Sequence, residues 1–317
     1  MTWLSRQLLR LVAVLFAVTL LTYFIVNILP GDVAIVILGN LATPEDIAGL
    51  RKDLGLDRPM LVRYFEWLGS ALSGDLGRSY RTSEPVAQAI IDRLPVSLQL
   101  MVMAQLTAVG IAIPAALLSV RKPGGIFDRI SAASAFGFLA VPSFMLGIVL
   151  IYVFSVRFDL LPATGFTPMS EGLWDNLESM ILPALTLGLI EWTVLMRVLR
   201  SDLLTTLKED FILLARAKGL PPWRVLLGHA LRPSSFTLIT VLGLNIGGLI
   251  GGAVIVEQIF ALPGVGRLLL GAIFNRDLIL VQGTVTFIAT SFVVINFLVD
   301  MLYAVLDPRV RHVRFRS

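Results

Sequence analysis

Residues 208–231 read KEDFILLARAKGLPPWRVLLGHAL, a basic stretch that lies between two long apolar segments of the chain. Apolar residues recur there at three- and four-residue spacing, which predicts an amphipathic helix. The predicted apolar face is made by Leu204, Leu207, Phe211 and Leu214. Such a helix suits either a loop that is presented to a partner or an ordinary connector between two membrane spans, and the spacing alone leaves both interpretations open.

Glycine and proline mark the end of this helix and the start of the next. Gly219 falls where a helix C-terminus needs a residue that tolerates a left-handed backbone. Pro221 and Pro222 suit the first turn of a second helix, because an amide hydrogen would be unbonded there in any case. We expect that second helix to cover residues 223–231. The stretch is therefore predicted as a helix, a glycine turn and a helix.

The amino-acid composition defines the class of protein. The chain has 317 residues, of which 56% are hydrophobic and only 15% are charged. Soluble domains are typically about 45–50% apolar and about 25% charged. Several apolar runs reach the roughly 20 residues that cross a bilayer as a helix. The sequence contains no cysteine, which excludes disulfides and thiolate chemistry. We predict an all-α polytopic membrane protein.

Six apolar segments are expected to span the membrane. A first span follows Arg6 and Arg10 and is retained, since its apolar run is too long for a signal peptide. The third segment contains Pro142, where we expect a kink. The predicted spans are residues 11–29, 95–120, 130–156, 180–199, 234–256 and 281–306.

These spans divide the chain into four predicted parts. A helix in the second part is expected to begin with Thr43 as N-cap and Pro44 at its first position, and another short helix follows at 63–77. The parts are the N-terminus with the first span (1–29), a small helical insertion outside the cytoplasm (30–93), a five-helix membrane core that includes the cytoplasmic loop 200–233 (94–306), and a basic tail (307–317).

Charge assigns the two sides of this topology. If both termini are cytoplasmic, most of the 26 Lys and Arg residues and few of the 22 Asp and Glu residues fall in cytoplasmic segments. This distribution agrees with the positive-inside rule, which has most force in short loops. The basic charge of residues 208–231 is then explained by topology, so nucleic-acid binding is not expected.

Polar residues within or near the spans are candidates for a transport pathway or a gate. They are Asn245, Glu257, Asn296 and Asp300, together with Glu191. Such groups face either a protein interior or a water-filled path. For Asn296 and Asp300, which share a helix face, hydrogen bonding between helices or an interfacial position is the simpler interpretation. The GxxxG spacing of Gly243, Gly247 and Gly251 predicts closely packed helices.

Motifs for nucleotide binding and hydrolysis are absent from the sequence. It has no GxxxxGK[ST] phosphate loop, no HExxH and no GxSxG. His229 and His312 lie far apart, so a histidine metal pair is not expected. We therefore predict no enzyme activity, metal or other cofactor in this chain. Energy for any transport must come from an ion gradient or from another subunit.

A series of short motifs runs in order along essentially the whole chain. The motifs are NILPGD, TPEDIAGLRKDLGLDRP, GDLGRSY, RLPVSLQL, VPSFMLGIVL, LPATGF, ILPALTLGL, FILLARAKGL, VIVEQIFALPGVGRLLLGAI and LVDMLYAVLDPRVR. In this order they resemble the permease subunits of bacterial binding-protein-dependent ABC importers, in the dipeptide, oligopeptide and nickel branch. The resemblance implies a type I importer permease fold with six transmembrane helices in the bacterial inner membrane.

The same resemblance implies a role for the basic loop. In that family the cytoplasmic loop carries the EAA motif, whose positions are matched by Leu213, Leu214, Ala215 and Gly219, with Leu213 in place of the glutamate. The short helix is then expected to dock in a groove on an ATPase subunit. The implied coupling residues are Phe211, Leu214, Ala215, Arg216, Ala217, Lys218, Gly219 and Leu220.

The family also implies the complex in which such a chain works. Expected partners are a second, similar permease, two cytoplasmic ATPases that bind ATP and Mg, an outer solute-binding protein and the lipid bilayer. The expected substrate is a short peptide, with nickel, glutathione, opines or sugars as alternatives. An ion-coupled secondary transporter that uses Glu191, Glu257 or Asp300 is the alternative from another class.

Overall fold

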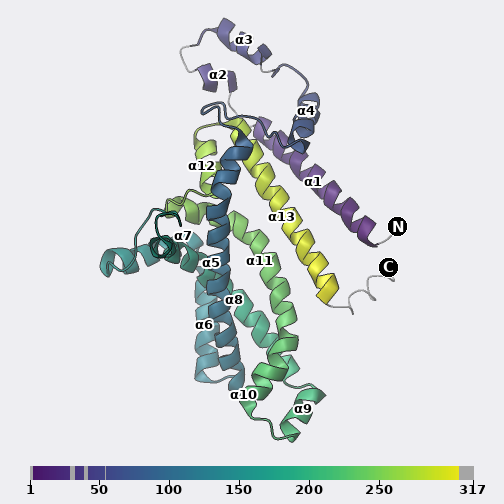
Figure 1. Cartoon of the computed structure of the whole chain (residues 1–317), viewed down its shortest axis with the longest axis vertical. Helices are drawn as coiled ribbons and strands as arrows, with labels where there is room; N and C mark the ends of the chain where they lie inside the picture. Colours follow the sequence, from purple (N-terminus) through teal and green to yellow (C-terminus); the bar gives the residue numbers. More distant parts are fainter. Residues whose placement is uncertain (1–2, 29–32, 39–41, 54, 307–317) are drawn as a thin grey trace. The chain divides into compact units, whose positions relative to one another are not determined.

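The computed structural model describes residues 3–28, 33–38, 42–53 and 55–306 of the chain (Figure 1). Regular structure in these residues is helical, and extended pairing among them is limited to an isolated bridge between Arg78 and Pro85. The predicted all-α class is confirmed. Contacts group the chain into two compact units, residues 1–97 with 263–294 and residues 98–262 with 295–317.

Long helices dominate both units. The first unit contains α1 (Trp3–Ile28), α2 (Val33–Leu38), α3 (Pro44–Asp53), α4 (Met60–Leu72), α12 (Val265–Phe274) and the first parts of α5 (Val86–Arg121) and α13 (Leu278–Leu306). The second contains the remainder of α5 and α13 with α6 (Ile126–Ala140), α7 (Ser143–Leu150), the π-helical turns η1 (Ile151–Arg157), α8 (Leu173–Thr206), α9 (Asp210–Ala217), α10 (Pro222–Arg224), the π-helical turns η2 (Val225–Ala230) and α11 (Leu231–Ile259).

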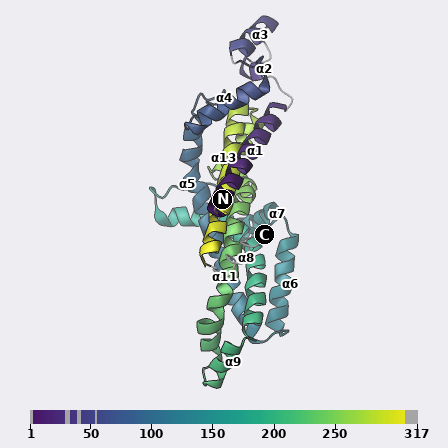
Figure 2. The same cartoon turned by 90° about the vertical axis from the view of Figure 1, so that its right-hand side faces the viewer.

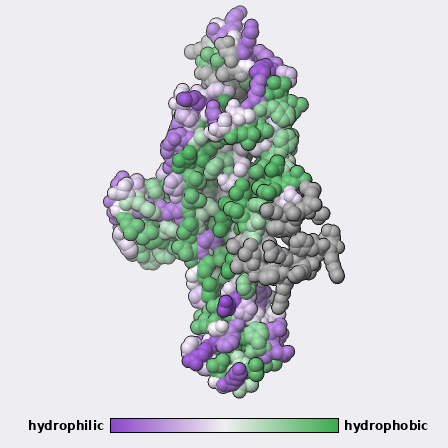
Figure 3. All heavy atoms as spheres, turned by 45° about the vertical axis from the view of Figure 1, so that its right-hand side comes forward, coloured by the Kyte–Doolittle hydropathy of each residue, from purple (hydrophilic) through white to green (hydrophobic). Residues whose placement is uncertain are grey.

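Five helical segments are long and apolar enough to cross a membrane. They are Gln7–Ile28, Val86–Arg121, Leu173–Thr206, Pro222–Leu249 and Leu278–Val299. A sixth is formed if the bent pair Ile126–Ala140 and Ser143–Arg157 counts as one span, which agrees with the six predicted spans. Figure 3 shows apolar residues over the surface of the long helices, as lipid contact requires.

A sharp bend separates α6 from α7. The two helices meet at 106°, so the kink predicted at Pro142 is confirmed but is far larger than a kinked span suggests. Val141 is extended at φ −93° and ψ 124°, because a residue before proline avoids the helical region. After the bend, Gly147 is buried, and a Cβ there would lie 3.3 Å from the ring of Phe260. The bend therefore directs α7 against its neighbours in the second unit.

Small residues let α5 and α8 pack closely in the second unit. Ala104, Ala108, Ala112 and Ala116 form a fully buried stripe along α5. On α8, a Cβ at Gly188 would lie 2.7 Å from Thr107 Cβ. Close packing was predicted only from the GxxxG spacing, which did not identify this alanine stripe. Close packing at Gly243 is confirmed, since a Cβ there would lie 2.5 Å from Val299 Cγ2. Figures 1 and 2 also show α6 beside α8.

In the first unit, α4 packs on α1 through aromatic rings. Tyr64 is fully buried, with its ring centroid 5.4 Å from that of Tyr23 and 5.9 Å from that of Phe16. Its hydroxyl lies 2.9 Å from Thr19 Oγ1. Arg63 Nη2 donates to Asn27 Oδ1 at 3.2 Å. Helix α4 thus packs back on the first span.

Side chains cap the starts of α3 and α13 in the first unit. Thr43 caps α3 as predicted: its Oγ1 accepts from the Asp46 amide at 3.2 Å, and Asp46 Oδ2 accepts from the Thr43 amide at 3.2 Å. Pro44 is the first helical residue. Asp277 precedes α13, and its Oδ1 accepts from the Leu280 amide at 3.2 Å. Each carboxylate satisfies an amide that the helix itself leaves unbonded.

Candidate functional site

The basic loop lies between α8 and α11, at one end of the second unit (Figure 1). The prediction that Leu204, Leu207, Phe211 and Leu214 form one apolar face is wrong. Helix α8 ends at Thr206 and α9 begins at Asp210, so the helical phase restarts across the turn between them. Asp210 in the first turn of α9 favours this restart, because its carboxylate interacts with the positive end of the helix dipole.

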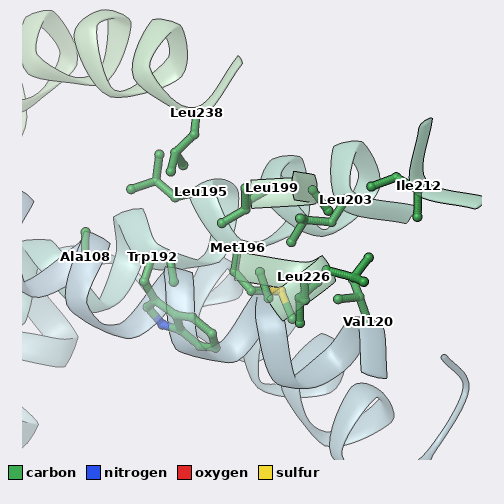
Figure 4. Close-up of a cluster of buried hydrophobic side chains, with 14 of the residues drawn as sticks. Ala108, Val120, Trp192, Leu195, Met196, Leu199, Leu203, Ile212, Leu226 and Leu238 are labelled. Atoms are coloured by element: carbon green, nitrogen blue, oxygen red, sulfur yellow. The ribbon is translucent and has the colours of Figure 1, made fainter. Parts of the chain in front are cut away.

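The new phase places a different pair of side chains in the core. Ile212 is fully buried and Ala215 is 5% exposed. Both belong to a cluster with Leu203 of α8 and with Val225 and Leu226 of η2. Figure 4 shows Ile212 and Leu203 directed toward the same cluster. Burial of Ile212 contributes about 1.5–3 kcal/mol to the stability of this contact. Helix α9 is therefore held firmly against α8 and η2.

The opposite side of α9 is open. Phe211, Leu213 and Leu214 are 46%, 51% and 57% exposed. The cations Arg216 and Lys218 are exposed beside them. We call this set of five residues the α9 surface. Large apolar side chains rimmed by charge are typical of a protein interaction site.

Of the predicted coupling residues, all but two are exposed. Ala217 and Gly219 are exposed with the α9 surface, whereas Leu220 is half-buried and Ala215 points inward. Leu213 was not among the predicted contact residues, although it is one of the most open apolar side chains of α9. Its position in the EAA motif is a sequence signal that could have identified Leu213 as a contact residue.

Gly219 ends α9 in the predicted way. Its φ is +79°, a left-handed angle that glycine adopts without strain. The Gly219 amide donates to the Arg216 carbonyl at 2.9 Å, and the Leu220 amide donates to the Ala215 carbonyl at 3.4 Å. Pro222 then takes the first helical position of α10. The glycine turn and the proline start are both confirmed.

The second predicted helix does not end at residue 231. Helix continues from Pro222 through η2 and α11, so the prediction of a separate helix over residues 223–231 is wrong. Pro233 has no amide hydrogen for the His229 carbonyl, and its ring needs extra room there. The widened π-helical turns over Val225–Ala230 supply this room. The loop is thereby joined without a break to a membrane span.

An ion pair holds the turn between α5 and α6 against α8. Arg200 Nε and Nη2 donate to the two carboxylate oxygens of Asp128 at 2.6 and 2.7 Å. Asp128 Oδ2 also accepts from the Gly124 amide at 2.7 Å. Bidentate geometry of this kind is strong and directional. Charge counting treated Asp128 only as a minor acid in a basic turn and gave no sign of this role.

The structure places two of the four candidate pathway residues far apart. Asn245 and Glu257 are both on α11, about 18 Å apart at 1.5 Å per residue, so they cannot form one small site. Glu257 is buried, and Asn245 and Asn296 are half-buried. The side chain of Asp300 lies outside the described residues. No group of three metal-ligating His, Asp or Glu side chains forms in the described part of the chain.

Glu191 makes a hydrogen bond between helices. Gln105 Nε2 on α5 donates to Glu191 Oε2 on α8 at 2.8 Å. This is one of the two interpretations that an acidic residue in a membrane span allows. The bond ties α5 to α8 near the start of the alanine stripe.

Fold and loop together define a polytopic membrane protein that presents a structured basic loop at one end of its helices. The chain matches the family described as "Binding-protein-dependent transport system inner membrane component" over residues 108–312. Residues 1–101 match the corresponding N-terminal component. The chain belongs to this family and is an integral inner membrane protein.

Relatives match the chain over nearly its whole length. A protein of Brucella abortus (strain 2308), named for a peptide transport system permease, is 41% identical over 307 residues, or 97% of this chain and 98% of the relative. The dipeptide transport system permease protein DppB of Escherichia coli (strain K12) is 37% identical over 331 residues, with 97% and 98% covered. A peptide ABC transporter permease of Sinorhizobium fredii is 35% identical over 311 residues, covering 98% and 99%.

Proposed function

We propose that this chain is a permease subunit that helps to form the translocation pathway of an ATP-driven importer of short peptides. The relatives that support this proposal carry names of peptide and dipeptide transport and align end to end with the chain. Those names favour peptides over nickel, glutathione, opines or sugars. Transport by alternating access requires that an energy source outside the chain change the packing of its helices.

The observation that carries the coupling role is the α9 surface. Its apolar side chains are 46–57% exposed, and its cations can pair with acidic groups of a partner. An amphipathic helix of this kind fits a groove on another protein. We infer that an ATPase subunit binds there and that ATP-driven closure pushes on α9.

Ile212 and Ala215 provide the path for this push into the membrane core. They join α9 to a buried cluster that includes Ala108 of α5, Leu203 of α8 and Leu238 of α11. Close-packed side chains transmit displacement because they compress little. Movement of α9 therefore displaces three long helices together, which is what reorientation of a pathway requires.

Several further parts of the proposal rest on the family alone. The complete importer contains a second permease, two ATPases that bind ATP and Mg, and an outer binding protein. Both termini and the loop 200–233 are cytoplasmic, and residues 30–93 face the binding protein. Asn245, Glu257, Asn296 and Asp300 remain proposed pathway or gate residues.

Gly219→Pro tests the coupling role. Proline cannot adopt φ +79° and removes the amide that bonds to Arg216, so the end of α9 must shift. Peptide uptake per ATP hydrolysed is therefore expected to fall, because the displaced end of α9 no longer fits the partner that pushes on it. The measurement uses the complete importer in proteoliposomes, with uptake and ATP hydrolysis followed together.

Gly219→Asn is the matched control, because asparagine tolerates a left-handed backbone. It is expected to keep uptake close to the wild-type level. Normal ATP-dependent uptake by Gly219→Pro, at equal membrane abundance, would contradict the coupling role. Uptake by this chain alone in ATP-free vesicles under an ion gradient would instead establish a secondary transporter.

A further inference from the structure

A hollow of about 750 Å³ opens at the end of the second unit that carries the basic loop. Its walls come from the end of α5, the turn after it, the start of α6, and the loop around α9 and α10. The residues used in the argument are Leu118, Arg121, Lys122, Ile126, Phe127 and Arg216. Arg216 also belongs to the α9 surface, whereas the functions proposed above do not use the other five residues.

Three cations line the hollow, and none of the described residues that line it is acidic. Arg121, Lys122 and Arg216 are all exposed, and no ion pair among the described residues includes any of them. The acid nearest in sequence to Arg121 and Lys122, Asp128, is already engaged by Arg200. A concave surface with cations of one sign and low-dielectric walls concentrates anions.

The apolar walls of the hollow are open to its surroundings. Leu118 and Phe127 are each 46% exposed and Ile126 is 80% exposed. Arg121 is the last residue of a helix that is long and apolar enough to span the membrane. Cations at the end of such a helix reach the headgroup layer, while apolar residues beside them contact acyl chains.

The turn that forms one wall is fixed within the chain. Gly124 has φ +74°, and a Cβ at Gly125 would lie 2.9 Å from the Lys122 carbonyl oxygen. The Gly124 amide is held by Asp128, which in turn is held by Arg200. The cationic wall is therefore formed before any ligand binds, which reduces the ordering cost of binding.

We propose that the hollow binds the headgroup of an anionic glycerophospholipid. Its phosphate lies among Arg121, Lys122 and Arg216, and its acyl chains follow Leu118, Ile126 and Phe127. Basic pockets between membrane helices are a known way of holding anionic headgroups. Because Arg216 is on α9 and Arg121 ends α5, the bound lipid connects α9 with a membrane span.

Native mass spectrometry of the complete purified importer tests this proposal. The probes are phosphatidylglycerol and phosphatidylcholine, offered separately and in competition. We expect retention of phosphatidylglycerol over phosphatidylcholine, with affinity reduced about fivefold by Arg121→Gln and about 25-fold by Arg121→Gln with Lys122→Gln, since each basic residue contributes about 1 kcal/mol.

Arg129→Gln is the matched control. Arg129 is an exposed arginine of α6 that does not line the hollow, so its removal changes net charge equally without changing the site. Equal retention of the two lipids, or equal losses in Arg121→Gln and Arg129→Gln, would overturn the proposal. Displacement of the lipid by millimolar inorganic phosphate would assign the site to a soluble anion. Unchanged lipid retention with weakened ATPase binding would assign it to acidic residues of that subunit.

Discussion

Helices α4 and α9 are both short, and both bury one side chain completely, yet their remaining surfaces differ. In α4, Tyr64 is buried against α1, and the exposed Phe65 still stacks on Phe16 at 6.5 Å. In α9, Ile212 is buried, but Leu213 and Leu214 are 51% and 57% exposed and do not belong to the described cluster around Ile212.

The charges of the two helices also differ. Arg63 of α4 binds Asn27, and Glu66 pairs with Arg58, so its polar groups are used within the chain. Arg216 of α9 takes part in no ion pair among the described residues. The comparison teaches that α4 packs on the first span of its own chain, whereas α9 packs on one side only and leaves open the side where we propose that a partner binds.

The largest expected effect is a loss of local stability when the Tyr64 ring, which packs α4 on α1, is removed. Tyr64→Ala leaves a cavity among the rings of α1 and is expected to lower local stability by about 3–5 kcal/mol. Hydrogen exchange of α4 amides measures this as faster exchange. Phe65→Ala is the matched control, because its ring is 57% exposed, and its effect is expected to be much smaller. Equal effects of the two variants would show that α4 is not held by Tyr64.

A pair of substitutions separates the two sides of α9. Ile212→Ala is expected to lower the stability of the loop by about 2–4 kcal/mol, because the vacated space is buried. Leu214→Ala is expected to change stability by less than about 0.5 kcal/mol but to weaken ATPase-subunit binding by about 10-fold or more, as loss of an interface anchor does. Thermal unfolding and subunit affinity measure the two properties. Unchanged affinity in Leu214→Ala would contradict an interface on the open side.

The smallest expected effect is a pH dependence at the start of α3. Hydrogen bonds from the Thr43 side chain, and then from its amide, lower the pKa of Asp46. The stabilisation is present above the unfolded pKa near 4 and is lost as pH falls through the lower folded pKa. Amide exchange at the start of α3 is therefore expected to rise at acid pH beyond its intrinsic change. Asp46→Asn should remove this dependence, and an identical pH profile in that variant would contradict the assignment.

The helical ends that the sequence predicted correctly are those with local causes. Thr43, Pro44 and Gly219 act through capping bonds, a fixed φ or a left-handed backbone, all of which involve only neighbouring residues. The bend at Pro142 has a local cause as well, although its angle depends on the helices against which α7 packs.

One apolar helix face was predicted where α8 and α9 are interrupted, and a helix end was predicted where the helix continues through Pro233. Both predictions were wrong. Residues 204–214 keep helical spacing in the sequence, and only the packing of Ile212 and Ala215 reveals that the phase restarts. At Pro233, the widened turns of η2 absorb a residue that local rules treat as a helix breaker. Spacing alone contains no information about either compensation.

Composition and motif order by themselves determined that this is a helical membrane protein of the importer permease type, because apolar length and local caps are properties of single segments. Only the tertiary structure decided which side of α9 is open, that Asp128 and Arg200 hold the turn after α5, and that Arg121, Lys122 and Arg216 share one hollow. These features join segments far apart in the chain, and their geometry is set by packing between helices, which no local pattern encodes.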